Sequence, residues 1–160
     1  MTAIISDCGR YRSTLERSLG QDGPTVLFMG VNPSKADARI NDQTVRKWMG
    51  FGQRWGAGHM VVGNVFDYRA TDVTELSRVP HPVSPMNWVH LANLLARADF
   101  AVPCWGARGK LPEHLRPHLD RMLCWLRESG VPLFHLGLTS SGDPKHPLTL
   151  GYDTPLTFWP

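Results

Sequence analysis

The sequence has few cysteines and no long apolar run, and each shortage excludes a class of protein. Its three cysteines lie far apart and form no C-x-x-C pair, so we expect reduced thiols. They are also too few for an iron–sulfur cluster held by four thiolates. No segment approaches the roughly 20 apolar residues of a membrane-spanning helix, and the first residues lack the basic stretch of a signal peptide. We therefore expect a soluble, cytoplasmic protein with no membrane partner.

Charge of one sign is also scarce. The 17 lysines and arginines only slightly exceed the 14 aspartates and glutamates, which gives a formal net charge of +3. This balance permits nucleic-acid binding, but on charge alone an ordinary solvated surface is the better explanation. A chain of 160 residues, of which 42% are hydrophobic, can bury one core without disulfides, so we expect a single domain over residues 1–160.

Short apolar runs alternate with amphipathic segments along the chain. The runs predict four buried strands, at residues 25–31, 59–66, 100–104 and 132–136. The segments between them predict helices that begin after Asn41 or Asp42, after a Ser84 cap, and near Pro112. This order is typical of an α/β protein. We expect a three-layer α/β/α fold around a short, mainly parallel four-stranded sheet.

Two segments follow no single pattern. Residues 10–19 show neither a clean helical period nor a clean strand period, so they predict either an extra antiparallel edge strand or a short helix. The tail from Gly151 to Pro160 is rich in proline and aromatic residues. It predicts an ordered but irregular cover over the body of the domain.

Polar and aromatic residues follow each predicted strand directly. In open parallel sheets, ligands bind beyond the carboxyl ends of the strands, so these loops are where we expect the site. The four loops are Gly30-Val-Asn-Pro-Ser34, Asn64-Val-Phe-Asp-Tyr-Arg69, Trp105-Gly106 and the segment from Gly137 to Pro147.

These loops resemble the motifs of a known superfamily. Gly30-Val-Asn-Pro33, Asn64 to Arg69, Cys104-Trp-Gly106 and His146-Pro147 are similar, in order and spacing, to motifs of the uracil-DNA glycosylases, in the form of the mismatch-specific uracil/thymine branch. The chain as a whole also resembles a bacterial and phage domain family of unknown function, through its N-P-S, D-x-T, R-A-T-D and Y-D-T-P features. The first resemblance implies a glycosylase-like fold and hydrolysis of an N-glycosidic bond.

The glycosylase resemblance also implies a set of site residues. Asn32 would orient a water molecule and His146 would hydrogen-bond the oxygen of the departing base, which makes these two the expected catalytic residues. Asn64 suits the edge of a pyrimidine, Phe66 or Tyr68 would stack on the base, and Arg69 with Lys145 would hold phosphate. The expected substrate-binding residues are Gly30, Pro33, Ser34, Asn64, Phe66, Tyr68, Arg69, Trp105, Gly106, Lys145 and Pro147. The expected partner is a nucleic acid or a nucleotide, with no cofactor and no metal.

Other interpretations of the same residues stay open. The pocket could act on free or modified nucleotides, or it could belong to a non-catalytic nucleic-acid-binding module. Asp37, Asp42 and Asp143 are candidates for water activation or for a metal, although Asp42 also fits a helix cap. His114 and His118 lie four residues apart, as metal ligands on a helix can, but the rest of a zinc signature is absent and a solvated helix face is the better explanation.

Overall fold

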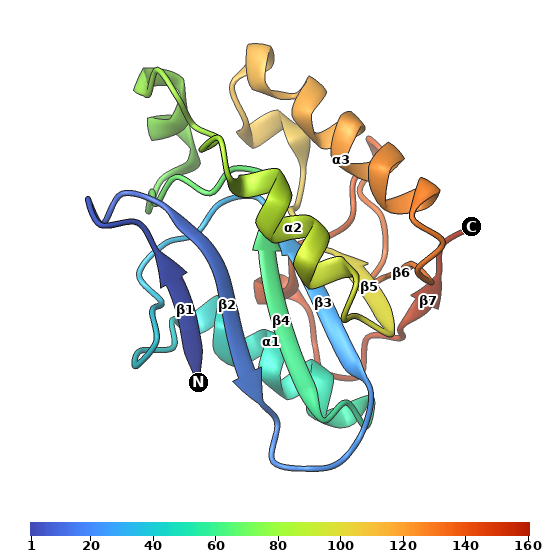
Figure 1. The fold of residues 1–160 in the computed structure, drawn as a ribbon. Coiled ribbons are helices and arrows are strands. Elements are labelled where there is room, and N and C mark those ends of the chain that lie inside the picture. Colours follow the sequence, from blue (N-terminus) through green and yellow to red (C-terminus); the bar gives the residue numbers. More distant parts are fainter.

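The computed structural model describes residues 1–160 and contains a mixed five-stranded sheet with helices on both faces (Figure 1). The strand order is β1–β2–β4–β3–β5. The central strand β3 pairs in parallel with β4 and β5, whereas β2 pairs antiparallel with β1 and β4. The strands are β1 (Thr2–Ile5), β2 (Arg12–Ser18), β3 (Thr25–Gly30), β4 (His59–Asn64) and β5 (Phe100–Pro103).

The prediction of a mainly parallel four-stranded sheet was wrong, because only β3, β4 and β5 form a parallel set. The expected fourth strand is reduced to β6 (Phe134–His135), which pairs antiparallel with β7 (Thr157–Phe158) in a small second sheet. A single bridge between Ala101 and Leu133 connects this segment to β5. Since Pro132 has no N–H and the Leu133 carbonyl accepts from Trp159, the segment cannot continue a ladder along β5.

The ambiguous residues 10–19 form a strand, β2, and the helical alternative was wrong. The predicted antiparallel strand is confirmed, but it lies inside the sheet and β1 occupies the edge beyond it. Consecutive residues of β2 from Arg12 to Leu15 are all buried, which explains why no clean alternation marks the strand.

Three helices cover the sheet, α1 on one face and α2 with α3 on the other (Figure 1). They are α1 (Gln43–Arg54), α2 (Asn87–Leu95) and α3 (Pro117–Glu128). Alternate residues of β3 face opposite layers: Val26 and Phe28 pack in the cluster of α1, and Leu27 and Met29 in that of α2 and α3. The expected three-layer arrangement is therefore observed.

The helix starts were predicted unevenly. The Asp42 carboxylate caps α1 by accepting the Val45 N–H at 2.9 Å, as expected. Ser84 does not cap α2, because its N–H and its hydroxyl both donate to Asp67, and the helix begins only at Asn87. Short 3-10 turns precede or follow these helices: η1 (Val73–Arg78), η2 (Arg108–Lys110), η3 (Glu113–Leu115) and η4 (Pro147–Thr149). No helix of the structure combines the length and the apolar character that crossing a membrane requires.

Candidate functional site

A cleft of about 1060 Å³ opens beyond the carboxyl ends of β3 and β5. Its walls come from the loop after β3, the N-terminus of α1, the loops after β4 and β5, and the segment leading into η4. A smaller space of about 50 Å³, here called the inner cavity, shares residues with the cleft and is also lined by Gly30, Trp48 and Arg12. The cleft therefore lies where the loops of a parallel sheet gather.

Seven predicted site residues converge on these two spaces. Six of them line the cleft: Asn32, Ser34, Trp105, Gly106, Lys145 and His146. The seventh, Gly30, lines the inner cavity. Both expected catalytic residues, Asn32 and His146, line the two spaces together.

The other six predicted residues lie outside the cleft lining. They are Pro33, Asn64, Phe66, Tyr68, Arg69 and Pro147. Asn64 is 1% exposed, and neither polar atom of its side chain has a hydrogen-bond partner. Phe66 is fully buried against His118, and Tyr68 packs edge-to-face on Tyr11. Arg69 donates to the backbone carbonyls of Ser34 and Gly9, so it braces the loop after β3. Their roles in binding stay predictions.

The side-chain amide of Asn32 is oriented by the backbone. Its Nδ2 donates to the carbonyl of Pro33 at 3.1 Å and to that of Ala70 at 2.8 Å. These two bonds fix which end of the amide is the oxygen. Oδ1 accepts nothing from the chain, so the cleft contains an acceptor that a water molecule or a ligand N–H can reach.

The imidazole of His146 is set up as a neutral donor. Burial lowers its pKa, nearby Lys110 lowers it further, and Asp42 opposes both effects. Its Nδ1 accepts from the Leu148 N–H at 3.4 Å, so the proton of the neutral ring lies on Nε2. Because no other residue takes that proton, Nε2–H is free to hydrogen-bond a ligand oxygen.

Gly106 permits the close approach of His146. Its φ is +83°, a region that side chains rarely adopt, and a Cβ added there would lie 3.2 Å from the Cβ of His146. Its N–H also donates to the carbonyl of Pro144 at 2.9 Å. The Trp105-Gly106 pair thus fixes the distance between the loop after β5 and the segment that carries His146.

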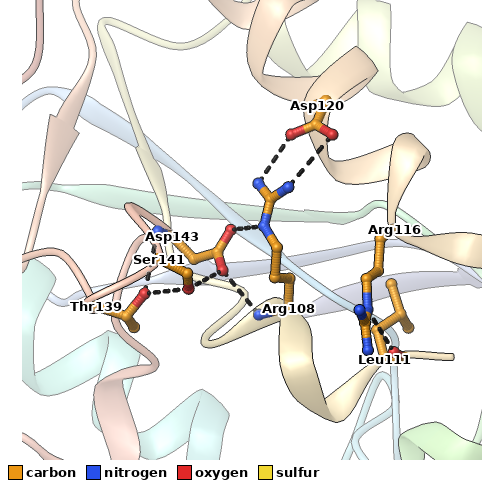
Figure 2. Close-up of polar contacts among 7 residues, drawn as sticks. All are labelled: Arg108, Leu111, Arg116, Asp120, Thr139, Ser141 and Asp143. Atoms are coloured by element: carbon orange, nitrogen blue, oxygen red, sulfur yellow. Dashed lines mark hydrogen bonds and ion pairs between the residues drawn. The ribbon is translucent and has the colours of Figure 1, made fainter. Parts of the chain in front are cut away.

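A buried carboxylate holds the segment that carries Lys145 and His146 (Figure 2). Asp143 is 1% exposed and accepts from the backbone N–H of Arg108 at 2.8 Å, from its Nε at 2.9 Å and from Ser141 Oγ at 2.8 Å. The same guanidinium then reaches Asp120 of α3. Asp143 is therefore an anchor, and it does not line the cleft.

The three aspartates expected as alternatives have different surroundings. Asp37 accepts the N–H groups of Arg39 and Ile40 in a turn and lies outside the cleft lining. Asp42 both caps α1 and lines the cleft and the inner cavity. Of these candidates only Asp42 is placed to meet a ligand. The structure places no group of three or more His, Cys, Asp or Glu side chains together in a way that could hold a metal ion.

Positive charge predominates around the cleft. Two carboxylates line it, Asp42 and Asp72, whereas the lysines and arginines that line it are Lys35, Arg46, Arg108, Lys110 and Lys145. Arg108 is paired with Asp120 and Asp143, and the other four make no ion pair. Unpaired cations around a concavity favour an anionic ligand.

Sequence reasoning missed several lining residues. Thr44, in the D-x-T feature, carried no chemical interpretation, whereas its neighbour Asp42 was expected as a candidate. Arg12 lines the inner cavity from β2, a strand whose pattern could not be told from a helix. Lys35, Arg46 and Lys110 had no local signal, because only the folded chain brings them to one rim.

These features define an α/β protein with a positively charged cleft at the carboxyl ends of its parallel strands. Residues 10–148 match the family described as "Protein of unknown function (DUF1643)", and the chain belongs to that family. The matched range includes every residue that lines the inner cavity. No curated protein and no solved structure matches the chain.

Proposed function

We propose that the cleft binds a nucleobase, carried by a nucleic acid or a nucleotide, and that the protein hydrolyses its N-glycosidic bond. The observation that carries this proposal is the pairing of two free groups in one cleft. Asn32 Oδ1 is an unoccupied acceptor and His146 Nε2–H an unoccupied donor. The resemblance of their loops to glycosylase motifs supports the same chemistry.

Each group has a defined task in that reaction. Cleavage builds positive charge on the sugar and negative charge on the departing base. A water molecule that donates to Asn32 Oδ1 attacks the anomeric carbon, the base leaves with the electron pair, and the proton of the water passes to solvent. His146 Nε2–H then donates to the base oxygen on which charge develops, a contribution of about 3 kcal/mol for a preorganised donor.

The surroundings fit a base attached to phosphate. Trp105 lines the cleft although it is only 6% exposed, and its buried Nε1–H has no partner in the chain, so this donor is available to a base. The unpaired cations Lys35, Lys110 and Lys145 are available for phosphate oxygens. A base in a duplex would have to be flipped out to reach the cleft.

A panel of oligonucleotides tests this proposal. The purified protein is incubated with single-stranded and duplex oligonucleotides that carry uracil, mismatched thymine, hypoxanthine or xanthine, and abasic sites are revealed by alkaline cleavage. We expect at least one substrate to be cleaved, and Asn32→Ala to abolish cleavage while it retains affinity. Asn93→Ala, the same change at an exposed position of α2, is the control and should cleave normally. Absence of cleavage across the panel would refute the hydrolase. Equal binding by all variants without any turnover would instead favour a binding module.

A further inference from the structure

Arg12 is a buried cation without a counter-ion. Its side chain projects from β2 and the residue is 2% exposed. Its one hydrogen bond runs from Nη1 to the carbonyl of Ala36 at 3.0 Å, and its Nε is buried with no partner. No carboxylate lies within ion-pair distance of it. Burial lowers the pKa of the guanidinium to about 10, so it still carries its charge at neutral pH.

The same strand holds a second buried arginine that shows what a purely structural one looks like. Arg17 is 1% exposed, and all three of its guanidinium nitrogens donate hydrogen bonds. The acceptors are Asn41 Oδ1 and the carbonyls of Thr2, Glu16, Asp37 and Ile40. Arg17 thus joins β1, its own strand β2 and the loop of residues 37–41, and it lines neither the cleft nor the inner cavity. Arg12 lacks such partners, and an unsatisfied buried charge is costly unless something else binds it.

The inner cavity is the space that Arg12 faces. Six residues line both this cavity and the cleft, so the two are continuous: Val31, Asn32, Ser34, Asp42, Thr44 and His146. The N-terminus of α1 adjoins it, and the N–H groups of Gln43 and Thr44, the first two residues of that helix, donate to nothing in the chain. Donors from Arg12 and from the helix therefore meet at one end of the cleft.

An acceptor lies beside these donors. Asp42 is the carboxylate of the inner cavity, and its two oxygens accept one backbone N–H each, from Val45 and Ala36, so further lone pairs remain. The charges of Arg12 and Asp42 nearly balance each other in the inner cavity. A phosphate dianion would be repelled there by the Asp42 carboxylate, so phosphate does not fit this cavity. The complementary group is neutral and carries an acceptor next to a donor.

We propose that the inner cavity receives the edge of a ring in which a carbonyl oxygen adjoins an N–H, as in a 6-oxopurine. Arg12 donates to the carbonyl oxygen and Asp42 accepts from the N–H. This inference rests on the proposed function and names the class of base it acts on. During N-glycosidic cleavage the electron pair of the broken bond enters the ring and reaches the carbonyl oxygen, whose two lone pairs accept from Arg12 and from His146 Nε2–H, both of which line the inner cavity.

Two nucleotides that differ only at this edge provide the test. Inosine 5′-monophosphate has a carbonyl and an N–H where adenosine 5′-monophosphate has an amino group and a bare ring nitrogen. We expect calorimetric titration of the unmodified protein to show about tenfold or more tighter binding of the inosine compound, since the mismatch leaves buried groups unpaired. Arg12→Met should weaken binding of the inosine compound more than that of the adenosine compound and so reduce the preference, leaving the part that Asp42 contributes.

The two arginines give the matched control. Arg12→Met removes a buried charge that makes one hydrogen bond, to the Ala36 carbonyl, so its thermal midpoint should stay near that of the unmodified protein or rise. Arg17→Met removes five hydrogen bonds and should lower the midpoint markedly, while any folded fraction keeps the preference for inosine. If Arg12→Met fails to fold, the comparison of the two nucleotides on the unmodified protein still decides.

Each failure has its own meaning. Equal affinity for both nucleotides, or a preference for inosine that is undiminished in Arg12→Met, overturns the inference and leaves nucleotide binding in place. Every base of the oligonucleotide panel carries a carbonyl oxygen beside an N–H. If neither nucleotide binds but an oligonucleotide is cleaved, Arg12→Met should therefore slow that cleavage, and undiminished cleavage overturns the inference alone. Binding of neither, with no cleavage in the panel, refutes the proposed function as well.

Discussion

The side-chain amide of Asn32 donates to two backbone carbonyls, and this predicts how substitutions there rank in stability. In Asn32→Asp, a carboxylate oxygen replaces the Nδ2 amide group. This oxygen cannot donate a hydrogen bond and faces the carbonyl oxygens of Pro33 and Ala70. We expect this variant to be less stable than Asn32→Ala at pH 7 by about 1 kcal/mol, the cost of facing a carboxylate with two carbonyls at a partly buried position. Repulsion raises the pKa of the new carboxyl in the folded state. Its stability should therefore be higher at low pH and fall as the pH rises through that pKa.

Urea unfolding at pH 4 and pH 7 measures this difference. Asn93→Asp, on the exposed side of α2, is the control and should change stability little at either pH. Equal stability of Asn32→Asp and Asn32→Ala at both pH values would show that the two carbonyls do not orient the amide.

His146 predicts a pH dependence of stability. Its pKa is lowered in the folded state, chiefly by burial, so the unfolded chain binds the proton more readily. The stabilisation is therefore complete above the unfolded pKa of about 6.5 and is lost as the pH falls through the folded value. Between pH 7.5 and pH 5 the thermal midpoint of the unmodified protein should fall more than that of His146→Gln. His118 and His135, whose pKa values are also lowered, are present in both proteins and cancel in the difference. Parallel pH profiles would contradict the burial of the ring.

A site residue could be predicted from the sequence where it directly follows a parallel strand, because this position places it at the carboxyl edge of the sheet. Asn32 and Trp105 come just after β3 and β5, and the carboxyl edge of a parallel sheet gathers such residues. Asn64 ends β4 in the same way, yet it is buried, because helices cover both faces of the sheet and an apolar run does not tell which face a residue takes. Arg12 could not be predicted, since its role depends on partners that it lacks.

At the level of elements, the contact between Arg108 and Asp143 should hold the segment before η4 in place. The Asp143 side chain is 1% exposed, whereas that of Asp120, the other partner of Arg108, is 60% exposed. We expect Asp143→Asn to lower the free energy of unfolding by about 2 kcal/mol or more, and Asp120→Asn by about 0–1 kcal/mol. Urea unfolding compares the two. Limited proteolysis within residues 137–146 should accelerate in Asp143→Asn alone, and similar behaviour of both variants would mean that the buried bond does not anchor the segment.

The elements that the sequence predicted well are those whose signals are local. The apolar runs of β3, β4 and β5 and the Asp42 cap of α1 each depend on neighbouring residues. By contrast, the start of α2 and the fate of the expected fourth strand depend on residues that are distant in the sequence. Asp67 takes the hydrogen bonds of Ser84, and the tail residue Trp159 takes the carbonyl of Leu133. Competition of this kind is invisible in a window of sequence.

For the molecule as a whole, the four unpaired cations of the cleft predict how strongly salt weakens binding. They are Lys35, Arg46, Lys110 and Lys145. A single-stranded oligonucleotide that contacted all of them would release condensed counter-ions, with log affinity falling by about 0.7 per contacted phosphate for each tenfold rise in salt. A nucleoside monophosphate brings one phosphate only. The slope should therefore be about four times steeper for the oligonucleotide.

Charge-removing variants separate the cleft from the protein's overall charge. Lys110→Gln and Lys145→Gln should each reduce the oligonucleotide slope by about 0.7, because each removes one phosphate contact. Lys47→Gln changes the net charge equally, but Lys47 lies over the Tyr152 ring and outside the cleft lining, so the slope should stay the same. The slopes are measured by fluorescence anisotropy of a labelled oligonucleotide at salt concentrations from about 50 to about 300 mM. If Lys47→Gln reduces the slope as much as the cleft variants do, the nucleic acid follows the general surface charge. If oligonucleotide and nucleotide show the same shallow slope, the cleft accommodates one phosphate and the natural ligand is a monomer, because a polymer in contact with four cations must release more than one counter-ion.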